Sequence, residues 1–85
     1  MGQLMKAVVH VSLKKTVLDP QGQTIARALE GMGYSTVRDV RQGKFFEIEL
    51  DGAAAPDQAR VEVEKIAREI LTNPVIEDFA CRLEE

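Results

Sequence analysis

The chain has 85 residues, of which 45% are hydrophobic and 29% charged, the composition of one small folded domain. Eleven Lys and Arg against fourteen Asp and Glu give a net charge of −3, which argues against partners that need strong positive charge, such as nucleic acid or an anionic membrane. The single cysteine excludes an intramolecular disulfide, and no apolar run is long enough to span a bilayer.

A strand and a helix are predicted at the start of the domain. From residue 5 to residue 13, apolar residues fill every second position, which is typical of a strand with one buried face. Asp19 is a helix-capping residue, and Pro20 suits a first helical turn because proline lacks an N–H. Gly22 either weakens the first turn slightly or lets another backbone come close. The apolar stripe of this helix, which ends near the glycines at 31 and 33, is Ile25, Ala28, Leu29 and Met32.

A hairpin is predicted in the middle of the chain. Its first strand covers residues 34–42, where Val37 and Val40 are an odd number of positions apart, which indicates a bulge. The turn lies at Gly43, and the return strand covers residues 44–51. The residues of the return strand that face the core are Phe46, Ile48 and Leu50.

A second helix and a last strand complete the domain. After a linker of small residues at 52–55, Pro56 begins the helix and Pro74 ends it. Residues 75–84 alternate between apolar and polar positions, as a strand does. The predicted buried stripe of the second helix is Ala59, Val63, Ile66, Ala67 and Ile70.

This order, β-α-β-β-α-β, predicts an α+β fold of the ferredoxin-like type. We expect a two-layer sandwich with a mainly antiparallel four-stranded sheet and both helices on one face. Residues 5–85 form the single domain, whereas residues 1–4 precede a second methionine and are expected to be an extension from an upstream start or from cloning. The absence of an export signal predicts the cytoplasm.

The sheet face away from the helices is half apolar, and four residues on it form a candidate homodimer interface. A chain of this size buries only about 60–65% of its unfolded surface on its own, so a second copy is the expected cover, in a dimer or a higher oligomer. We call these residues the sheet-face patch: Val8, His10, Phe45 and Ala80.

The sequence predicts no catalytic, cofactor-binding or metal-binding residue. His10 has no nucleophile or carboxylate arranged beside it, and we interpret it as structural or as part of an interface. Cys81 falls on an inward strand position and is interpreted as a small hydrophobic residue. Glu47 and Glu49 share a strand face at a solvated hairpin edge. Neither metal-ligand spacing nor a phosphate-binding glycine motif occurs.

Three basic residues around the predicted hairpin turn form a candidate docking site for a larger protein. Arginine suits bidentate pairing with carboxylates, so the site is expected to meet an acidic patch, although a solvated turn would also explain it. We call these residues the positive cluster: Arg38, Arg41 and Lys44.

Four sequence blocks occur in order, VLDPQG at 17–22, GY at 33–34, VRDVRQGK at 37–44 and NPVIEDF at 73–79. Together they resemble the PurS family, the small subunit of bacterial phosphoribosylformylglycinamidine synthase, also called formylglycinamide ribonucleotide amidotransferase. The resemblance extends over residues 5–84 and implies a two-layer α/β fold.

The resemblance also implies a non-catalytic accessory role in de novo purine biosynthesis. In that family a PurQ-type glutaminase subunit releases ammonia, and a large PurL-type synthetase subunit binds ATP and carries out the carbon–nitrogen ligation. The small subunit is a dimer that bridges the two and assists ammonia transfer. ATP and glutamine would therefore be used by the partner subunits, and this chain would need no cofactor.

Two other functions are compatible with the residues alone. A regulatory module similar to ACT domains would bind a small molecule at a dimer interface near residues 13–21. A stand-alone enzyme would use His10 or the strand carboxylates.

Overall fold

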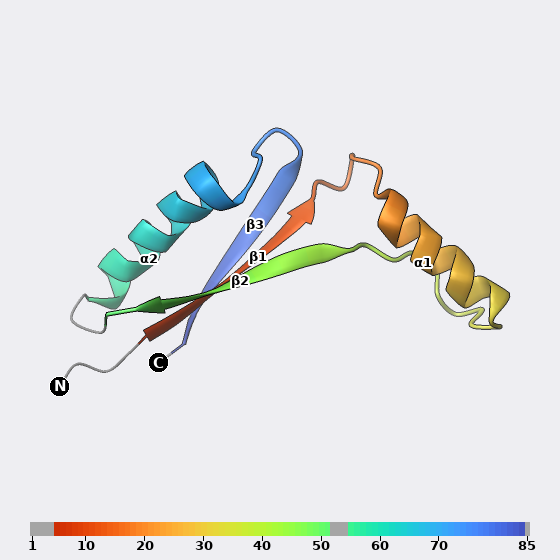
Figure 1. Cartoon of the computed structure of the whole chain (residues 1–85), viewed down its shortest axis with the longest axis horizontal. Coiled ribbons are helices and arrows are strands. Elements are labelled where there is room, and N and C mark those ends of the chain that lie inside the picture. Colours follow the sequence, from red (N-terminus) through yellow and green to blue (C-terminus); the bar gives the residue numbers. More distant parts are fainter. Residues whose placement is uncertain (1–4, 52–54, 85) are drawn as a thin grey trace.

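A three-stranded antiparallel sheet lies at the centre of the computed structural model, which describes residues 5–51 and 55–84 (Figure 1). The central strand, β1 (Met5–Leu13), is flanked by β2 (Gly43–Leu50) and β3 (Glu77–Glu84). The predicted extension at residues 1–4 and most of the predicted linker, residues 52–54, lie outside the described residues.

The core forms where β1 meets its two neighbours. Val9 lies opposite Phe46 of β2 and Cys81 of β3, and Val11 lies opposite Phe79. Both valines are buried. Each of these two side chains stabilises the fold by about 1.5–3 kcal/mol relative to exposure, and strict alternation puts both on the same face.

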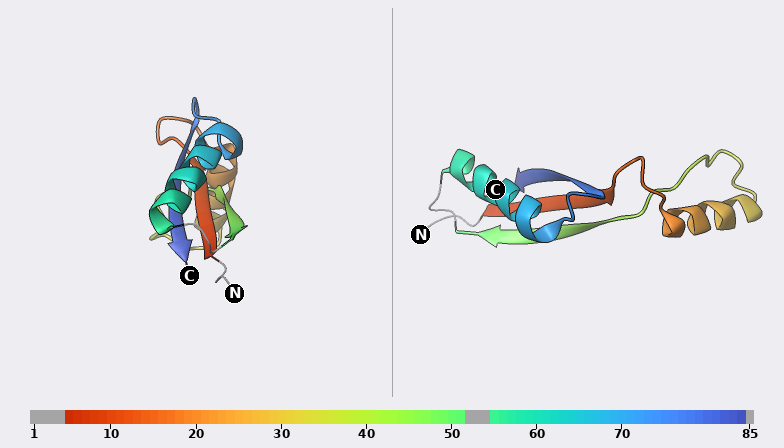
Figure 2. Two further views of the ribbon diagram at one scale, coloured as in Figure 1. Left: turned by 90° about the vertical axis from the view of Figure 1, so that its left-hand side faces the viewer. Right: turned by 90° about the horizontal axis from the view of Figure 1, so that it is seen from above.

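One helical segment covers this face of the sheet. It consists of α2 (Pro56–Ile66) and the π-helical turn η1 (Ala67–Leu71) that continues it (Figure 2). Val63 and Ala67 are fully buried against β1, so these positions of the predicted stripe are confirmed.

The predicted burial of Ile70 is wrong, since its side chain is 74% exposed. The wide turn of η1 explains the difference, because a π-helical turn takes more residues than an α-helical one. Leu71 packs against the core instead, and the Thr72 hydroxyl donates to the Ala67 carbonyl five residues earlier at 2.9 Å.

The other helix, α1 (Pro20–Gly31), projects away from the sheet, which corrects the predicted sandwich (Figures 1 and 2). Among the described residues, α1 packs extensively against neither the sheet nor α2. The radius of gyration is 16.7 Å, against about 12 Å for a compact chain of this length. The prediction of two helices on one face is therefore wrong. Neither helix is long and apolar enough to cross a membrane.

The predicted strand at 34–42 is also wrong, and with it the four-stranded sheet. This segment consists of turns and irregular backbone, because it follows α1 away from the sheet and has no strand edge to pair with. We call residues 14–42, which comprise α1 and the segments on both sides of it, the arm. The described chain thus has the order β-α-β-α-β.

The predicted ends of the helices are largely confirmed. Pro20 and Pro56 occupy the first turns of α1 and α2. Gly33 follows α1 with a φ of +96°, and the Tyr34 N–H donates to the Leu29 carbonyl, a common C-terminal cap. The last strand begins two residues later than predicted because Asn73 closes a turn first.

Candidate functional site

The sheet brings the four residues of the sheet-face patch together. His10 on β1 lies directly opposite Phe45 on β2 and Ala80 on β3, and the His10 and Phe45 rings are 5.8 Å apart. Phe45 is 59% exposed, whereas Val8, in the next row, is only 5% exposed. The row formed by His10, Phe45 and Ala80 is therefore an accessible apolar surface. Its burial in a homodimer stays a prediction.

Charged side chains border this row. Lys6 forms an ion pair with Glu47 at 3.1 Å, and Arg82 pairs with Glu84 at 2.8 Å. Such exposed pairs contribute only about 0–1 kcal/mol each to stability. An apolar centre with a charged rim is the usual composition of a protein–protein interface.

The arm meets the sheet at a second site, where the Asp19 carboxylate lies almost completely buried. Its Oδ1 accepts a hydrogen bond from the Gly22 N–H at 3.0 Å, and its Oδ2 accepts one from the Gln42 N–H at 2.7 Å. The N–H groups of Gly22 and Gln42 and the nearby Arg41 guanidinium hold the pKa of this carboxyl below its ordinary value of 3.8. Asp19 thus caps α1 as predicted and also binds the segment that returns to β2.

Arg41 forms the opposite link. Its Nη2 donates to the carbonyl oxygens of Lys14 at 2.8 Å and Val17 at 3.0 Å. A further bond joins the Gln42 amide to the Gln21 amide oxygen at 2.6 Å. We call Asp19 and Arg41, with the backbone groups of residues 14, 17, 22 and 42 that they bind, the arm root.

The three residues of the positive cluster have different surroundings in the structure. Arg41 is engaged in the arm root, and the Lys44 ammonium lies 3.9 Å from Glu77 and 5.7 Å from the centre of the Phe46 ring. Arg38 is exposed and makes no interaction with the described residues. A docking role for the cluster stays a prediction, and Arg38 is the member with its guanidinium available.

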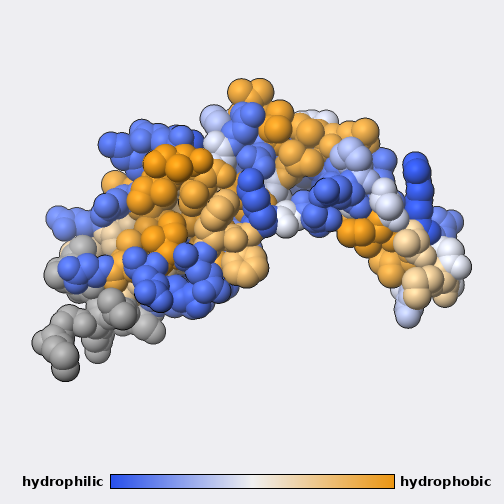
Figure 3. All heavy atoms as spheres, in the orientation of Figure 1, coloured by the Kyte–Doolittle hydropathy of each residue, from blue (hydrophilic) through white to orange (hydrophobic). Residues whose placement is uncertain are grey.

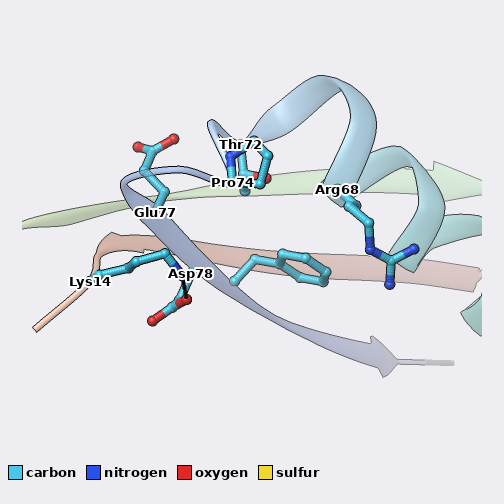
Figure 4. Close-up of a pocket in the computed structure, with 7 residues that line it drawn as sticks. Lys14, Arg68, Thr72, Pro74, Glu77 and Asp78 are labelled. Carbon is cyan, nitrogen blue, oxygen red and sulfur yellow. Dashed lines mark hydrogen bonds and ion pairs between the residues drawn. The ribbon is translucent and has the colours of Figure 1, made fainter.

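An open pocket of about 360 Å³ lies between η1 and the start of β3 (Figure 4). Lys14 and Asp78 form an ion pair of 2.8 Å at one side of it (Figure 4). The Arg68 guanidinium lies at its other side (Figure 4). Opposite charges in the pocket compensate each other, and no nucleophile is paired with a base. Its lining residues are Lys14, Arg68, Thr72, Pro74, Glu77, Asp78 and Phe79.

The side chains that could carry chemistry are dispersed. Burial and the charge of Glu64 raise the pKa of the Cys81 thiol, which makes it a poor nucleophile at neutral pH. His10 contacts the Phe45 ring, and Glu47 pairs with Lys6. Within residues 5–51 and 55–84, no group of three His, Cys, Asp or Glu side chains could hold a metal ion.

Comparison with known proteins identifies the family. The model of the PurS family, described as phosphoribosylformylglycinamidine (FGAM) synthase, matches residues 6–85. The PurS subunit of this synthase from Mycobacterium leprae is 46% identical over 81 residues, which cover 95% of this chain and 98% of that protein. The chain belongs to the PurS family.

Solved PurS structures share the elongated shape. The crystal structure of Methanocaldococcus jannaschii PurS superimposes with a TM-score of 0.85 at 37% identity and covers 95% of this chain and 96% of that one. The structure of PurLQS from Thermotoga maritima gives a TM-score of 0.86 at 33% identity, with coverage of 96% and 99%. The arm is about a third of the chain, so such scores require it to point in a similar direction in these PurS chains.

Polar groups of the loop that the ACT-like alternative would use are already engaged within the chain. In the loop before α1, where a ligand would bind, Arg41 binds the carbonyls of Lys14 and Val17, and each carboxylate oxygen of Asp19 accepts a hydrogen bond from a backbone N–H. The PurS relationship accounts for the chain without this alternative.

Proposed function

We propose that this chain is the accessory subunit that bridges the glutaminase and synthetase subunits of FGAM synthase and assists the transfer of ammonia between them. As a PurS subunit of that synthase, it takes part in purine biosynthesis. The observation that carries the proposal is the match over 96% of the chain to a PurS chain in the PurLQS structure from Thermotoga maritima.

The geometry supports a role in assembly. The described residues offer exposed surfaces and several open pockets, with no paired nucleophile and base. The dimensions of the chain are 53 × 27 × 14 Å, so its two ends can touch different proteins at once. ATP and glutamine are accordingly assigned to the PurL-type and PurQ-type partners, and the complex to the cytoplasm.

A homodimer is part of this proposal. Apolar side chains lie at the surface along the arm as well as over the sheet and α2 (Figure 3). Leu18, Ile25 and Met32 are all exposed on the arm, and an isolated helix of 12 residues is only marginally stable in water. We infer that a second copy covers the sheet-face patch, so that two arms project from the dimer toward the larger subunits.

The test is reconstitution of the synthase from the purified chain, a PurQ-type glutaminase and a PurL-type synthetase. We expect FGAM formation from glutamine to require this chain. Formation from an added ammonium salt should depend on it much less, because free ammonia reaches the synthetase without the glutaminase. Equal glutamine-dependent rates with and without the chain would contradict the proposal.

A further inference from the structure

The direction of the arm depends on a few contacts at its base. Two segments at the base of the arm join it to the sheet, residues 14–19 after β1 and residues 39–42 before β2. Among the described residues, α1 makes no extensive contact with the sheet or with α2 (Figures 1 and 2). Whatever holds these two segments together therefore sets the angle between α1 and the sheet.

The two charged side chains of the arm root join these segments reciprocally. Asp19, on the outgoing segment, accepts a hydrogen bond from the Gln42 N–H of the returning segment. Arg41, on the returning segment, donates to the carbonyls of Lys14 and Val17 on the outgoing one. All three bonds end on backbone atoms and are charge-assisted, so they fix the course of the backbone itself.

The backbones at this point are also in direct contact. A Cβ atom built on Gly22 would lie 2.1 Å from the Val40 carbonyl oxygen, closer than any side chain tolerates. The first turn of α1 thus contacts the backbone of the returning segment directly. This contact leaves α1 little room to change its angle to the sheet. The similar direction of the arm in the PurLQS structure indicates that it is kept in an assembled complex.

We propose that Asp19 and Arg41 are positioning residues of the synthase, which hold the arm in the orientation that glutamine-dependent turnover requires. This inference rests on the proposed function. Neither residue touches a reacting atom; both act through the placement of α1 against a larger subunit.

Spin labels on the two helices report the orientation directly. Cysteines are introduced by Arg27→Cys on α1 and Gln58→Cys on α2, both exposed, in a Cys81→Ser background. Distances are measured by double electron–electron resonance, with labelled chain diluted into unlabelled chain so that only pairs within one chain count. We expect one narrow distance distribution, broadened by Asp19→Asn and by Arg41→Gln.

Lys15→Gln is the matched control, because it removes one positive charge from the outgoing segment at an exposed residue that makes no interaction with the described residues. It should leave the distribution narrow. Arg41→Lys keeps the charge but has a shorter side chain that lacks Nη2, the atom that donates both bonds, so it should broaden the distribution as well. This milder variant also serves if Asp19→Asn does not fold, which circular dichroism checks.

Activity assays on the reconstituted complex complete the test. Asp19→Asn and Arg41→Lys should lower glutamine-dependent kcat about tenfold and leave the ammonium-dependent rate close to that of the unaltered chain. Full activity of Arg41→Lys would show that only the charge matters and would overturn the inference. Unchanged distance distributions, or broadened ones with full glutamine-dependent activity, would also overturn it while leaving the proposed function intact. Failure of the unaltered chain to support the complex would instead overturn the proposed function.

Discussion

The close contact between Gly22 and Val40 permits a sharp test with two glycines of the same helix. A Cβ atom on Gly22 would lie 2.1 Å from the Val40 oxygen and 2.7 Å from Asp19 Oδ2, whereas one on Gly31 meets nothing within 4 Å. The substitutions Gly22→Ala and Gly31→Ala are chemically identical. Because only the Cβ atom on Gly22 would clash with its surroundings, the two substitutions should have opposite effects on the stability of α1.

The magnitude follows from the two contacts. Overpacking usually costs about 1–3 kcal/mol, and the upper part of that range applies at Gly22 because the opposing atom is backbone. The higher helix propensity of alanine offsets about 1 kcal/mol, so Gly22→Ala should destabilise α1 by about 1–2 kcal/mol. Gly31→Ala should stabilise it by about 0.4–1 kcal/mol.

Native-state amide hydrogen exchange measures the free energy of opening of α1 separately from that of the sheet. Gly22→Ala should speed the exchange of α1 amides about 5–30-fold, and Gly31→Ala should slow it. Amides of β1 should change little in either variant. Exchange in Gly22→Ala that is no faster than in the unaltered chain would refute the close approach of the two backbones.

Three further predictions concern the core, the arm root and the dimer. Val63→Ala should lower the free energy of unfolding by about 2 kcal/mol, seen as a lower Tm at fixed protein concentration, whereas Val61→Ala, at an exposed site of the same helix, should change it by less than about 0.5 kcal/mol; equal effects would contradict the assigned core. Because the pKa of Asp19 is lowered, its stabilisation of the arm is present above pH 3.8 and lost as the pH falls below that value, so the protection of α1 amides relative to their intrinsic exchange rate should fall in acid in the unaltered chain but not additionally so in Asp19→Asn. Phe45→Glu should shift the sedimentation of the dimer toward the monomer with unchanged circular dichroism, while Val61→Glu should not; a stable dimer in Phe45→Glu would place the interface elsewhere.

The sheet and α2 were predictable because their signals are local. Alternation in β1 and the apolar spacing of α2 each encode one buried face, and Pro20 and Pro56 mark the first turns of the helices. The error at Ile70 arose from a single wide turn, which no spacing rule for regular helices anticipates.

The predicted strand at 34–42 failed for a non-local reason. A strand needs an edge to pair with, and the edge is absent where α1 leads the chain away from the sheet. The odd spacing of Val37 and Val40 argues against a strand in this segment, since it gives no continuous apolar face. The interpretation of this spacing as a bulge led to the prediction of a strand that the fold does not contain.

The arm root was only half predictable. The sequence indicates Asp19 as a helix cap and gives a close approach as one of two interpretations of Gly22, but the second bond of Asp19 reaches a residue 23 positions away. Arg41 is predicted to dock onto a partner because arginine suits bidentate pairing with carboxylates, whereas here its guanidinium binds two carbonyls. Both contacts form because the arm projects away from the sheet, and the sequence alone does not predict this projection.

The projecting arm makes the chain depend on two kinds of support. In a closed sandwich, the first helix would be held by burial against the sheet, and the sheet by both helices. Here only α2 and its continuation η1 cover the sheet among the described residues, whereas α1 relies on polar bonds at its base and keeps its apolar side chains exposed. Polar bonds fix direction better than apolar contacts do, because hydrogen bonds are directional and the hydrophobic effect is not. An arm anchored in this way can therefore expose apolar surface to a partner and still present it at a defined angle, which is the property that a bridging subunit needs.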